Sequence, residues 1–483
     1  MGLFVGLDVG TTSVSAVALD ADAARVVAAV SRPHGAGRTG AVAGRAELDV
    51  DALWEVTQGV LAAVAADVGD RRAIGALGVT GQMHGLALVG SDGTPMAPAI
   101  TWQDQRGAES DAAGGTYLER FIAEAGGPEA FARMGALPAT GYLGPSLYWL
   151  RRNGLLPAAA ATACLIPDAI VARLTAGPPV TDPTDAASTG LYDVVGGAWD
   201  RDLLRRLGLP EGLLAPVRAS GDVAGRLDPD VARRVGLTPG LPVAVAIGDN
   251  QASYIGSVRH AADALLVNIG TGAQVSALMD AFATAPGLEA RPFPGGRYLL
   301  VGAGLFGGAS YALLRDLFAR IGEALFGGAE AEGLYERMNE LAARVPPGSD
   351  GLRFTPLFAG TRVDPTVRGN LTGMGVHNLT PGHLARALLE GVAEQLHGLY
   401  DAMRPLAGAR TDLVGAGNAV ERNALLARLL ATRFGLPLHL PAFEEPAAVG
   451  SALVAATAAG AFGDLDAAMA GTVRYRAAVD PEA

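Results

Sequence analysis

The chain of 483 residues contains a single cysteine, Cys164. One thiol cannot form a disulfide within the chain, an iron–sulfur centre or a Cys-x-x-Cys zinc site. Cys164 lies in an apolar stretch, so we interpret it as a small buried core residue. A chain of this length can bury a large core without such staples.

Positive charge is also scarce. Lys and Arg number 37 against 49 Asp and Glu, which leaves a net charge of −12. An acidic surface disfavours binding to nucleic acid and to anionic lipid. We therefore expect small-molecule partners, with no nucleic acid and no membrane, and the sequence leaves a homodimer open.

Signals for export or membrane insertion are missing as well. The N-terminal stretch has no basic region and reaches an acid at Asp8. The longest uncharged run, residues 446–463, is rich in Ala and Gly, which favours a buried helix over a membrane span. The expected location is the cytoplasm.

Short β-rich runs alternate with helical stretches along the chain. Strands are expected at residues 3–9, 14–19, 74–79, 242–247, 265–269 and 411–414. Helices are expected at 51–66, at 309–325 and from Pro381, where an apolar residue recurs every fourth position. Thr380 and Pro381 suit a helix cap and a first helical position. This alternation predicts an α/β fold.

Two similar turns lie far apart in the chain. Residues 8–13 read Asp-Val-Gly-Thr-Thr-Ser, and residues 268–273 read Asn-Ile-Gly-Thr-Gly-Ala, each between two β-rich runs. The distance exceeds any solenoid period, so we expect a duplicated domain in which each half gives one turn to a shared cleft. The proline-bounded segment 238–242 is the predicted boundary, which divides the chain into domains 1–241 and 242–483.

The two turns are candidate phosphate sites. Glycine lets the backbone approach an anion, and successive amides and hydroxyls can bond phosphate oxygens. Asp8, at the end of the preceding strand, suits the water shell of a magnesium ion. An ordinary hairpin turn is the alternative, and the second Gly-Thr turn favours the phosphate interpretation. The candidate residues are Gly10, Thr11, Thr12, Ser13, Gly270 and Thr271.

Polar and aromatic side chains follow the strand expected at 74–79. Gln82 and His84 can bond ligand hydroxyls, and Trp102 and Asp104 add a flat apolar surface and a carboxylate. This mixture suits a sugar. Two alternatives stay open, namely a structural histidine at position 84 and a loop salt bridge between Asp104 and Arg106.

A lone carboxylate, Asp249, follows the strand expected at 242–247. Ligands of open α/β sheets gather at the carboxyl ends of strands, where a carboxylate can accept the proton of an attacking hydroxyl. A helix N-cap is the alternative. The Gly-rich residues 415–419, after the strand expected at 411–414, would let a planar base lie against the backbone, although such turns are common.

Taken together and in this order, the motifs resemble the FGGY family of carbohydrate kinases within the actin-like ATPase superfamily. The resemblance runs from Asp8 to Gly450. It implies two ribonuclease-H-like domains flanking a central cleft, with ATP as co-substrate, Mg²⁺ at Asp8 and Asp249 as catalytic base. It also implies an acceptor site of Gln82, Met83, His84, Trp102, Asp104 and Asn250, and a nucleotide site that includes the two turns with Gly415, Gly417 and Asn418.

The Gln-Met-His triplet at 82–84 is similar to that of xylulokinases and sedoheptulokinases rather than glycerol kinases, so the expected acceptor is a ketose. The Trp-Gln-Asp triplet at 102–104 looks more like that of sedoheptulokinases. We therefore expect sedoheptulose, with D-xylulose as the alternative and an actin-like nucleotide switch without sugar kinase activity as the distant one. Ser15 and Ser146 stand where relatives often carry a basic residue, so a phosphate contact is either missing or supplied elsewhere.

Overall fold

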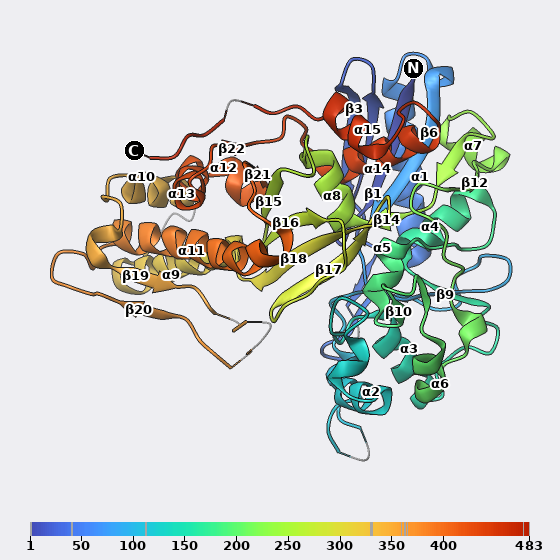
Figure 1. The fold of residues 1–483 in the computed structure, drawn as a ribbon, viewed down its shortest axis with the longest axis horizontal. Coiled ribbons are helices and arrows are strands. Elements are labelled where there is room, and N and C mark those ends of the chain that lie inside the picture. Colours follow the sequence, from blue (N-terminus) through green and yellow to red (C-terminus); the bar gives the residue numbers. More distant parts are fainter. Residues whose placement is uncertain are drawn as a thin grey trace.

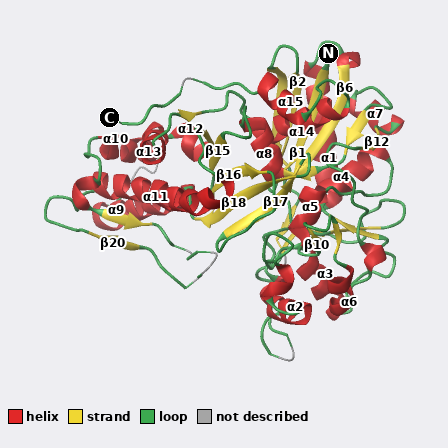
Figure 2. Cartoon of the chain, viewed as in Figure 1, coloured by secondary structure: helices red, strands yellow, loops and turns green. Residues whose placement is uncertain are grey.

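The computed structural model of the chain describes residues 2–482 except 40–41, 112–113, 329–331, 359, 362–363, 365 and 477 (Figure 1). Two groups of strands lie side by side, each with helices packed around it (Figure 2). The predicted α/β class with two similar halves is confirmed.

The first sheet has the strand order β12-β13-β6-β1-β2-β3, with β14 also paired to β6. β1 and β2 form an antiparallel hairpin, and β6 runs parallel to β1 on its other side. Its strands are β1 (Leu3–Val9), β2 (Ser13–Asp20), β3 (Arg25–Pro33), β6 (Ile74–Gly81), β12 (Val223–Arg226), β13 (Pro242–Ala244) and β14 (Ile247–Gly248).

The second sheet repeats this arrangement with the order β17-β18-β16-β15-β21-β22. β15 and β16 form the hairpin, and β21 runs parallel to β15. The run β3-β2-β1-β6-β13 therefore corresponds to β18-β16-β15-β21-β22, as a duplicated domain requires. The strands are β15 (Ala264–Ile269), β16 (Ala273–Met279), β17 (Leu288–Phe293), β18 (Arg297–Leu305), β21 (Asp412–Ala416) and β22 (Leu438–His439).

The strand expected at 242–247 is broken in two. The N–H of Val245 donates to the carbonyl oxygen of Asp222 (2.9 Å), while β13 and β14 pair with β6 on either side of this point. Both pieces thus belong to the first sheet, although they follow the boundary expected between domains 1–241 and 242–483. We propose that the halves divide after β14, where α8 (Asp249–Ser257) begins.

The helices expected from periodicity are present with small shifts at their ends, as α1 (Val50–Asp67), α9 (Gly308–Phe326) and α11 (Pro381–Ala407). The Thr380 side chain accepts the N–H of His383, and Pro381 takes the first helical position, as predicted. Cys164 is buried, as expected. In the second half α11 packs against α10 (Leu334–Ala343) and α13 (Ala424–Phe434).

A lobe inserted into the first half lies below its sheet in Figure 1 and has its own apolar core. Its elements are β7 (Ala87–Val89), α2 (Tyr117–Ala125), α3 (Leu143–Arg152), β9 (Thr162–Cys164), α5 (Pro183–Ala186), β10 (Tyr192–Asp193), β11 (Ala198–Trp199) and α6 (Arg201–Leu207). Helix α4 (Ile166–Thr175) packs on the first sheet instead. The remaining elements are β4 (Gly37–Thr39), β5 (Ala46–Leu48), β8 (Ala99–Ile100), α7 (Pro229–Val235), β19 (Arg353–Thr355), β20 (Asn370–Thr372), α12 (Asn418–Arg422), α14 (Pro446–Ala458) and α15 (Leu465–Thr472).

Helix α14 is the buried helix predicted for the uncharged run, and it seals the first sheet although it lies near the end of the chain. It packs on β1, β6 and α8. Glycine stands at each crossing, because a Cβ at Gly6, Gly78 or Gly256 would lie 1.8–1.9 Å from a carbonyl oxygen of this helix. Within the described residues, no helix is both long and apolar enough to cross a bilayer.

The seat of α14 against α8 predicts a stability effect. A Cβ at Gly450 would lie 1.9 Å from the carbonyl oxygen of Ala252, so Gly450→Ala must push the two helices apart. We expect chemical denaturation to show a loss of about 1–3 kcal/mol, the usual cost of overpacking. Gly398→Ala, in α11 where the added Cβ meets no atom, is the matched control and should be neutral or slightly stabilising. Equal stability of the two variants would contradict this packing.

Candidate functional site

Three parallel strands of the first sheet end at the same edge. Val9 and Gly248 both pair with Gly81, from β1, β14 and β6 respectively. Neighbouring strands lie about 5 Å apart. The turn at 10–13, the triplet at 82–84 and Asp249 therefore leave the sheet side by side, as the sequence predicted for a site at strand ends.

The turn at residues 10–13 is held by two of the predicted acceptor residues. The N–H of Gly10 donates to the Ser13 carbonyl (3.0 Å), which closes the hairpin. The Gln82 amide donates to the Gly10 carbonyl (3.3 Å), and the Trp102 indole N–H donates to Oγ1 of Thr11 (3.0 Å). Trp102 is 46% exposed. The predicted phosphate turn and the predicted sugar motifs thus form one unit.

The surroundings of Asp8 disfavour the ionised form of its carboxyl group. Its Oδ1 is buried and has no hydrogen-bond partner in the described structure. Burial, together with the negative charges of Asp249 and Glu445, raises the pKa of Asp8 to about 7. A cation beside Asp8 would relieve both effects.

This donor set fits Mg²⁺, which takes few carboxylates and completes its shell with water and phosphate oxygens. Within the described residues, no three His, Cys, Asp or Glu side chains are grouped to hold an ion by themselves. The unpartnered oxygen of Asp8 fits the expected magnesium ligand, and this role stays a prediction.

Asp249 is the first residue of α8, and Gly248 takes the cap position. The helix has no side-chain cap, so the N-cap alternative for Asp249 does not hold. Burial raises the pKa of Asp249 to about 6, while the positive charge of Arg291 and the N–H of Asn250 act in the opposite direction. Asn250 is buried beside it, with an Oδ1 that has no partner in the described structure.

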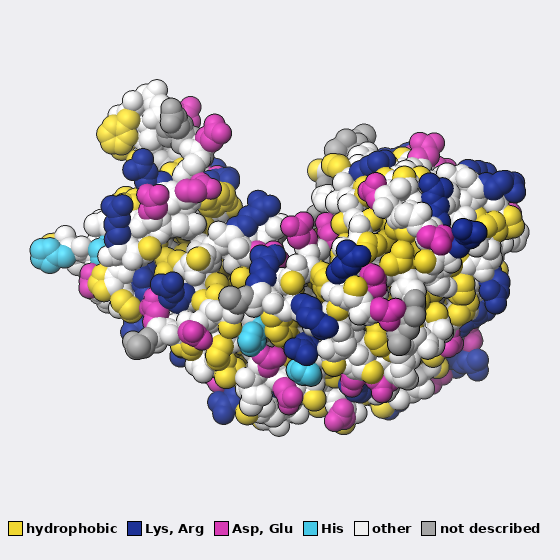
Figure 3. All heavy atoms as spheres, turned by 90° about the horizontal axis from the view of Figure 1, so that it is seen from above, with side chains coloured by type: hydrophobic (Ala, Val, Ile, Leu, Met, Phe, Trp, Pro, Cys, Tyr) yellow, Lys and Arg dark blue, Asp and Glu magenta, His cyan; other side chains and the backbone are white. Residues whose placement is uncertain are grey.

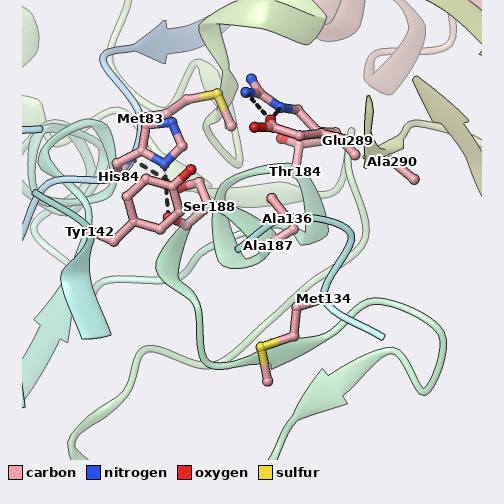
Figure 4. Close-up of a pocket in the computed structure, with 11 residues that line it drawn as sticks. Met83, His84, Met134, Ala136, Tyr142, Thr184, Ala187, Ser188, Glu289 and Ala290 are labelled. Atoms are coloured by element: carbon pink, nitrogen blue, oxygen red, sulfur yellow. Dashed lines mark hydrogen bonds and ion pairs between the residues drawn. The ribbon is translucent and has the colours of Figure 1, made fainter. Parts of the chain in front are cut away.

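A narrow pocket lies between the two halves (Figure 4). It is lined by Met83, His84, Met134, Ala136, Tyr142, Thr184, Ala187 and Ser188 of the first half, and by Glu289, Ala290 and Arg291 of β17. Met83 and His84 are the predicted acceptor residues among these. The pocket therefore brings part of the predicted sugar site against a strand of the second half.

His84 is both anchored and part of the pocket wall. Its backbone has φ of +75°. Its N–H donates to Oγ of Ser188 (3.0 Å), and its Nδ1 lies 2.9 Å from the Ser188 carbonyl oxygen. The ring stacks on Tyr142 with centroids 4.1 Å apart (Figure 4). These contacts fix the ring. His84 is therefore a structural histidine, as the alternative interpretation had it, and it also lines the pocket.

Asp104 lies in the loop salt bridge that was its alternative interpretation. Its oxygens accept from Nε and Nη2 of Arg106 (2.7 and 3.0 Å) and from the N–H of Ala46 (2.8 Å). Arg106 also pairs with Glu47 (2.7 Å). The fully buried Asp104 is outside the pocket lining, as is Trp102, and direct sugar contacts by these two residues stay predictions.

The second sheet forms a matching edge. Asn268 at the end of β15 pairs with Ala416 at the end of β21, so the turn at 270–272 and residues 417–418 emerge together. A cavity of about 570 Å³ opens there. Of the predicted nucleotide residues, Gly270, Thr271 and Asn418 line this cavity.

Gly415 and Gly417 shape the backbone of this edge without lining the cavity. Gly415 lies inside β21, one residue beyond the predicted strand end, where a Cβ would meet the side chain of Val420 at 2.9 Å. Gly417 has φ of +90°, and a Cβ there would lie 2.6 Å from the Ile269 carbonyl oxygen. Their nucleotide contacts stay predictions.

Several polar residues of this cavity were not among the predicted site residues. Tyr311 Oη and Asn423 Nδ2 both donate to Oδ1 of Asn339 (2.8 and 2.9 Å), and Tyr335 stacks on Tyr311 with centroids 5.9 Å apart. Arg422 also lines the cavity. These residues lie on helices whose periodicity indicates only a core face, and no strand-end motif marks them.

Ser15 and Ser146, which stand where relatives often carry a basic residue, have only polar contacts or none in the described structure. Ser15 shares a hydrogen bond with Ser31 (2.8 Å) and hydrogen-bonds the Glu445 carboxylate. Ser146 is buried in α3, and its Oγ has no partner in the described structure. Arg422 contributes a positive charge to the lining of the cavity at the second sheet. Figure 3 shows the molecule hollowed between the half with α9–α11 on the left and the first half on the right.

Comparison with known proteins covers nearly the whole chain. The model of the FGGY family of carbohydrate kinases, N-terminal domain, matches residues 3–256, and that of the C-terminal domain matches residues 265–459. A sedoheptulokinase of Homo sapiens is 30% identical over 485 residues, covering 93% of this chain and 96% of the relative. A glycerol kinase 2 of Streptomyces avermitilis is 30% identical over 482 residues, covering 95% and 89%.

A solved structure is equally similar in extent. The xylulose kinase of Rhodospirillum rubrum superposes with a TM-score of 0.85 at 27% identity, covering 99% of this chain and 94% of that one.

The raised pKa of Asp8 predicts how stability depends on pH without metal. Between about pH 4 and 7 the folded state binds the proton that the unfolded state has lost, so the free energy of unfolding falls as pH rises. Asp8→Asn removes this titration. In EDTA it should gain stability over the natural chain at pH 8, by at most about 4 kcal/mol, and little at pH 4. Asp67→Asn, at an exposed position, is the control, and an Asp8→Asn curve parallel to the natural one would reject the assignment.

Proposed function

The chain belongs to the FGGY family of carbohydrate kinases, and from that premise we propose that it transfers the γ-phosphoryl group of ATP to a terminal primary hydroxyl of a ketose, with sedoheptulose the first candidate. Members of the family are phosphotransferases with an alcohol acceptor. The observation that carries the proposal is the position of Asp249, at the end of β14 beside the Gln-Met-His triplet that follows β6.

Asp249 is the proposed catalytic base. With a pKa of about 6 the carboxylate is ionised at neutral pH and remains basic enough to take a proton. It accepts the proton of the acceptor hydroxyl while the acceptor oxygen bonds to the γ-phosphorus and the bond from that phosphorus to the β-phosphate oxygen breaks. ADP and a sugar phosphate ester leave, and the proton is released from Asp249.

The two Gly-Thr turns are the proposed phosphate grips. Their backbone N–H groups and the hydroxyls of Thr11, Thr12 and Thr271 can donate to phosphate oxygens, and Arg422 adds a positive charge at the nucleotide cavity. Asp8 would hold Mg²⁺ through its unpartnered oxygen, and the ion supplies charge neutralisation at the β- and γ-phosphates when bound.

The cavity at the second sheet is the proposed adenosine site. Its volume of about 570 Å³ suits a nucleoside, and small residues at Gly270 and Ala309 allow close approach. Tyr335 offers an aromatic face, and the bonded pair of Asn339 and Asn423 offers amide groups. These contacts would leave the triphosphate directed toward the turn at 270–272.

The choice of ketose draws on two different relatives. The similarity to a sedoheptulokinase along nearly the whole of both chains favours sedoheptulose. The similarity in fold and sequence to a xylulose kinase keeps D-xylulose as the second candidate.

A panel of sedoheptulose, D-xylulose and glycerol with coupled ADP detection tests the proposal. Sedoheptulose is expected to have the highest kcat/KM, glycerol as best acceptor would overturn the ketose assignment, and ATP turnover indifferent to every sugar would favour a nucleotide switch.

The base assignment predicts a selective loss. Asp249→Asn should lower kcat by about 10²–10⁴, since it removes the proton acceptor. ADP affinity, measured by calorimetry, should stay within about twofold, because the nucleotide cavity does not include this residue. Asp280→Asn, exposed at the end of β16, is the matched control. Turnover of Asp249→Asn near that of the control would remove Asp249 from the mechanism.

A further inference from the structure

The narrow pocket contains an ion pair that the proposed chemistry does not use. Glu289 and Arg291 are two positions apart on β17, so both side chains leave the same face of the strand. Nε and Nη2 of Arg291 donate to one carboxylate oxygen, Oε2 of Glu289 (3.0 and 2.6 Å). The side chains are only 7% and 12% exposed, for Glu289 and Arg291 respectively. This is a largely buried pair of opposite charges in the wall of the proposed acceptor site.

The strand that carries the pair is held by contacts to the first half at Gly135 and to helix α8. The N–H of Ala290 donates to the carbonyl oxygen of Gly135 (2.9 Å), and Nε2 of Gln251 in α8 donates to the carbonyl oxygen of Pro292 (2.8 Å). A Cβ at Gly135 would lie 1.8 Å from the Ala290 carbonyl oxygen, so only glycine permits this contact. The backbone therefore fixes β17 in the pocket without help from the ion pair.

Buried ion pairs contribute little net stability, because desolvation of both charges offsets their attraction. Since backbone contacts already seat β17, stability gives no sufficient reason for two charged groups at this place. Their position opposite Met83, His84 and Ser188 suggests a ligand (Figure 4).

The charge balance of the pocket indicates whether its ligand is neutral or charged. Glu289 and Arg291 cancel each other, and Asp249, whose pKa is lowered by Arg291, adds one negative charge at neutral pH. A carboxylate or phosphate on the acceptor would meet a net negative pocket. Adjacent hydroxyls of a neutral sugar can instead donate to the Glu289 carboxylate and accept from the guanidinium, which together offer acceptor and donor groups side by side.

We propose that Glu289 and Arg291 are acceptor-specificity residues that bind two adjacent hydroxyls of a neutral polyol and exclude sugar acids and sugar phosphates. The inference rests on the proposed function, because it assumes that the acceptor occupies the pocket beside Asp249. It adds the charge class of the acceptor and a second set of recognition groups, contributed by the second half of the chain.

Glu289→Gln tests the proposal. The substitution keeps the shape of the side chain but leaves the charge of Arg291 uncompensated. With the best ketose of the panel, KM should rise about 10–100-fold, the range for a lost charged hydrogen bond, while kcat changes less. With the sugar acid of the same carbon number, kcat/KM should rise at least about tenfold. Unchanged discrimination between the two acceptors would overturn the proposal.

Arg291→Met separates the charge effect from general damage. It should raise the ketose KM by a similar factor without any gain on the sugar acid, because the cation is gone. A gain on the sugar acid by both variants would contradict the assigned roles. Asp466→Asn, which breaks the surface pair with Arg297 (2.8 Å), is the matched control and should leave acceptor preference unchanged.

Two outcomes distinguish this inference from the proposed function. If the natural chain prefers glycerol to every ketose, the ketose assignment fails, and the shift between neutral and acidic acceptors in Glu289→Gln still tests the pocket. If Glu289→Gln does not bind ADP and is misfolded, Arg291→Lys takes its place. The loss of the planar fork should raise the ketose KM about tenfold, and an unchanged KM would overturn the proposal.

Discussion

The site depends on the seating of α14 on the first sheet. Carbonyl oxygens of this helix lie where side chains would otherwise stand on β1, β6 and α8, and glycine at each crossing is the only residue that permits such an approach. Because α8 begins with Asp249 and β1 carries Asp8, the same contact positions both carboxyl groups at one edge of the sheet. Residues near the end of the chain thus determine the geometry of a motif at its beginning.

Electrostatics gives this edge its character. Burial raises the pKa values of Asp8, Asp249 and Glu445. The charges of Asp249 and Glu445 add to this effect at Asp8, and Arg291 acts against it at Asp249. A site of this kind is incomplete without positive charge, which a nucleotide-bound cation would bring at Asp8. The pair of Glu289 and Arg291 places balanced charge on the opposite wall. In the proposed mechanism the negative edge with Asp8 would attract the metal ion and its phosphates, and the neutral ion pair on the opposite wall would bind the acceptor.

Much of the fold could be predicted from sequence because its signals are local. The strand at 3–9, the capped helix from Pro381 and the buried uncharged helix depend on periodicity, a cap and composition, and the structure has all three. The break between β13 and β14 could not be predicted, since it depends on a bond from Val245 to Asp222 in a neighbouring segment. The division that we propose after β14 likewise depends on a distant partner, because β13 and β14 both pair with β6.

The candidate site residues also fall into two groups, those marked by a local sequence signal and those that are not. Motifs at strand ends were found because the strand itself marks them, as for Asp249 and the turn at 10–13. For Asp104 the sequence left two interpretations open, a sugar contact and a salt bridge with Arg106. Only the structure shows that the salt bridge forms. Tyr335, Asn339, Glu289 and Arg291 come from helices and an edge strand of the second half, and only tertiary packing brings them to their cavities.

The central claim is that two matching turns from the two halves grip one triphosphate while Asp249 activates an alcohol. A crystal structure of the chain with a non-hydrolysable ATP analogue, Mg²⁺ and a ketose tests it most directly. The account predicts phosphate oxygens bonded to both the 10–13 and the 270–272 turns, with the terminal hydroxyl of the sugar within hydrogen-bond reach of Asp249, at about 2.6–3.2 Å. A triphosphate bonded to one turn alone, with Asp249 remote from the sugar, would contradict it.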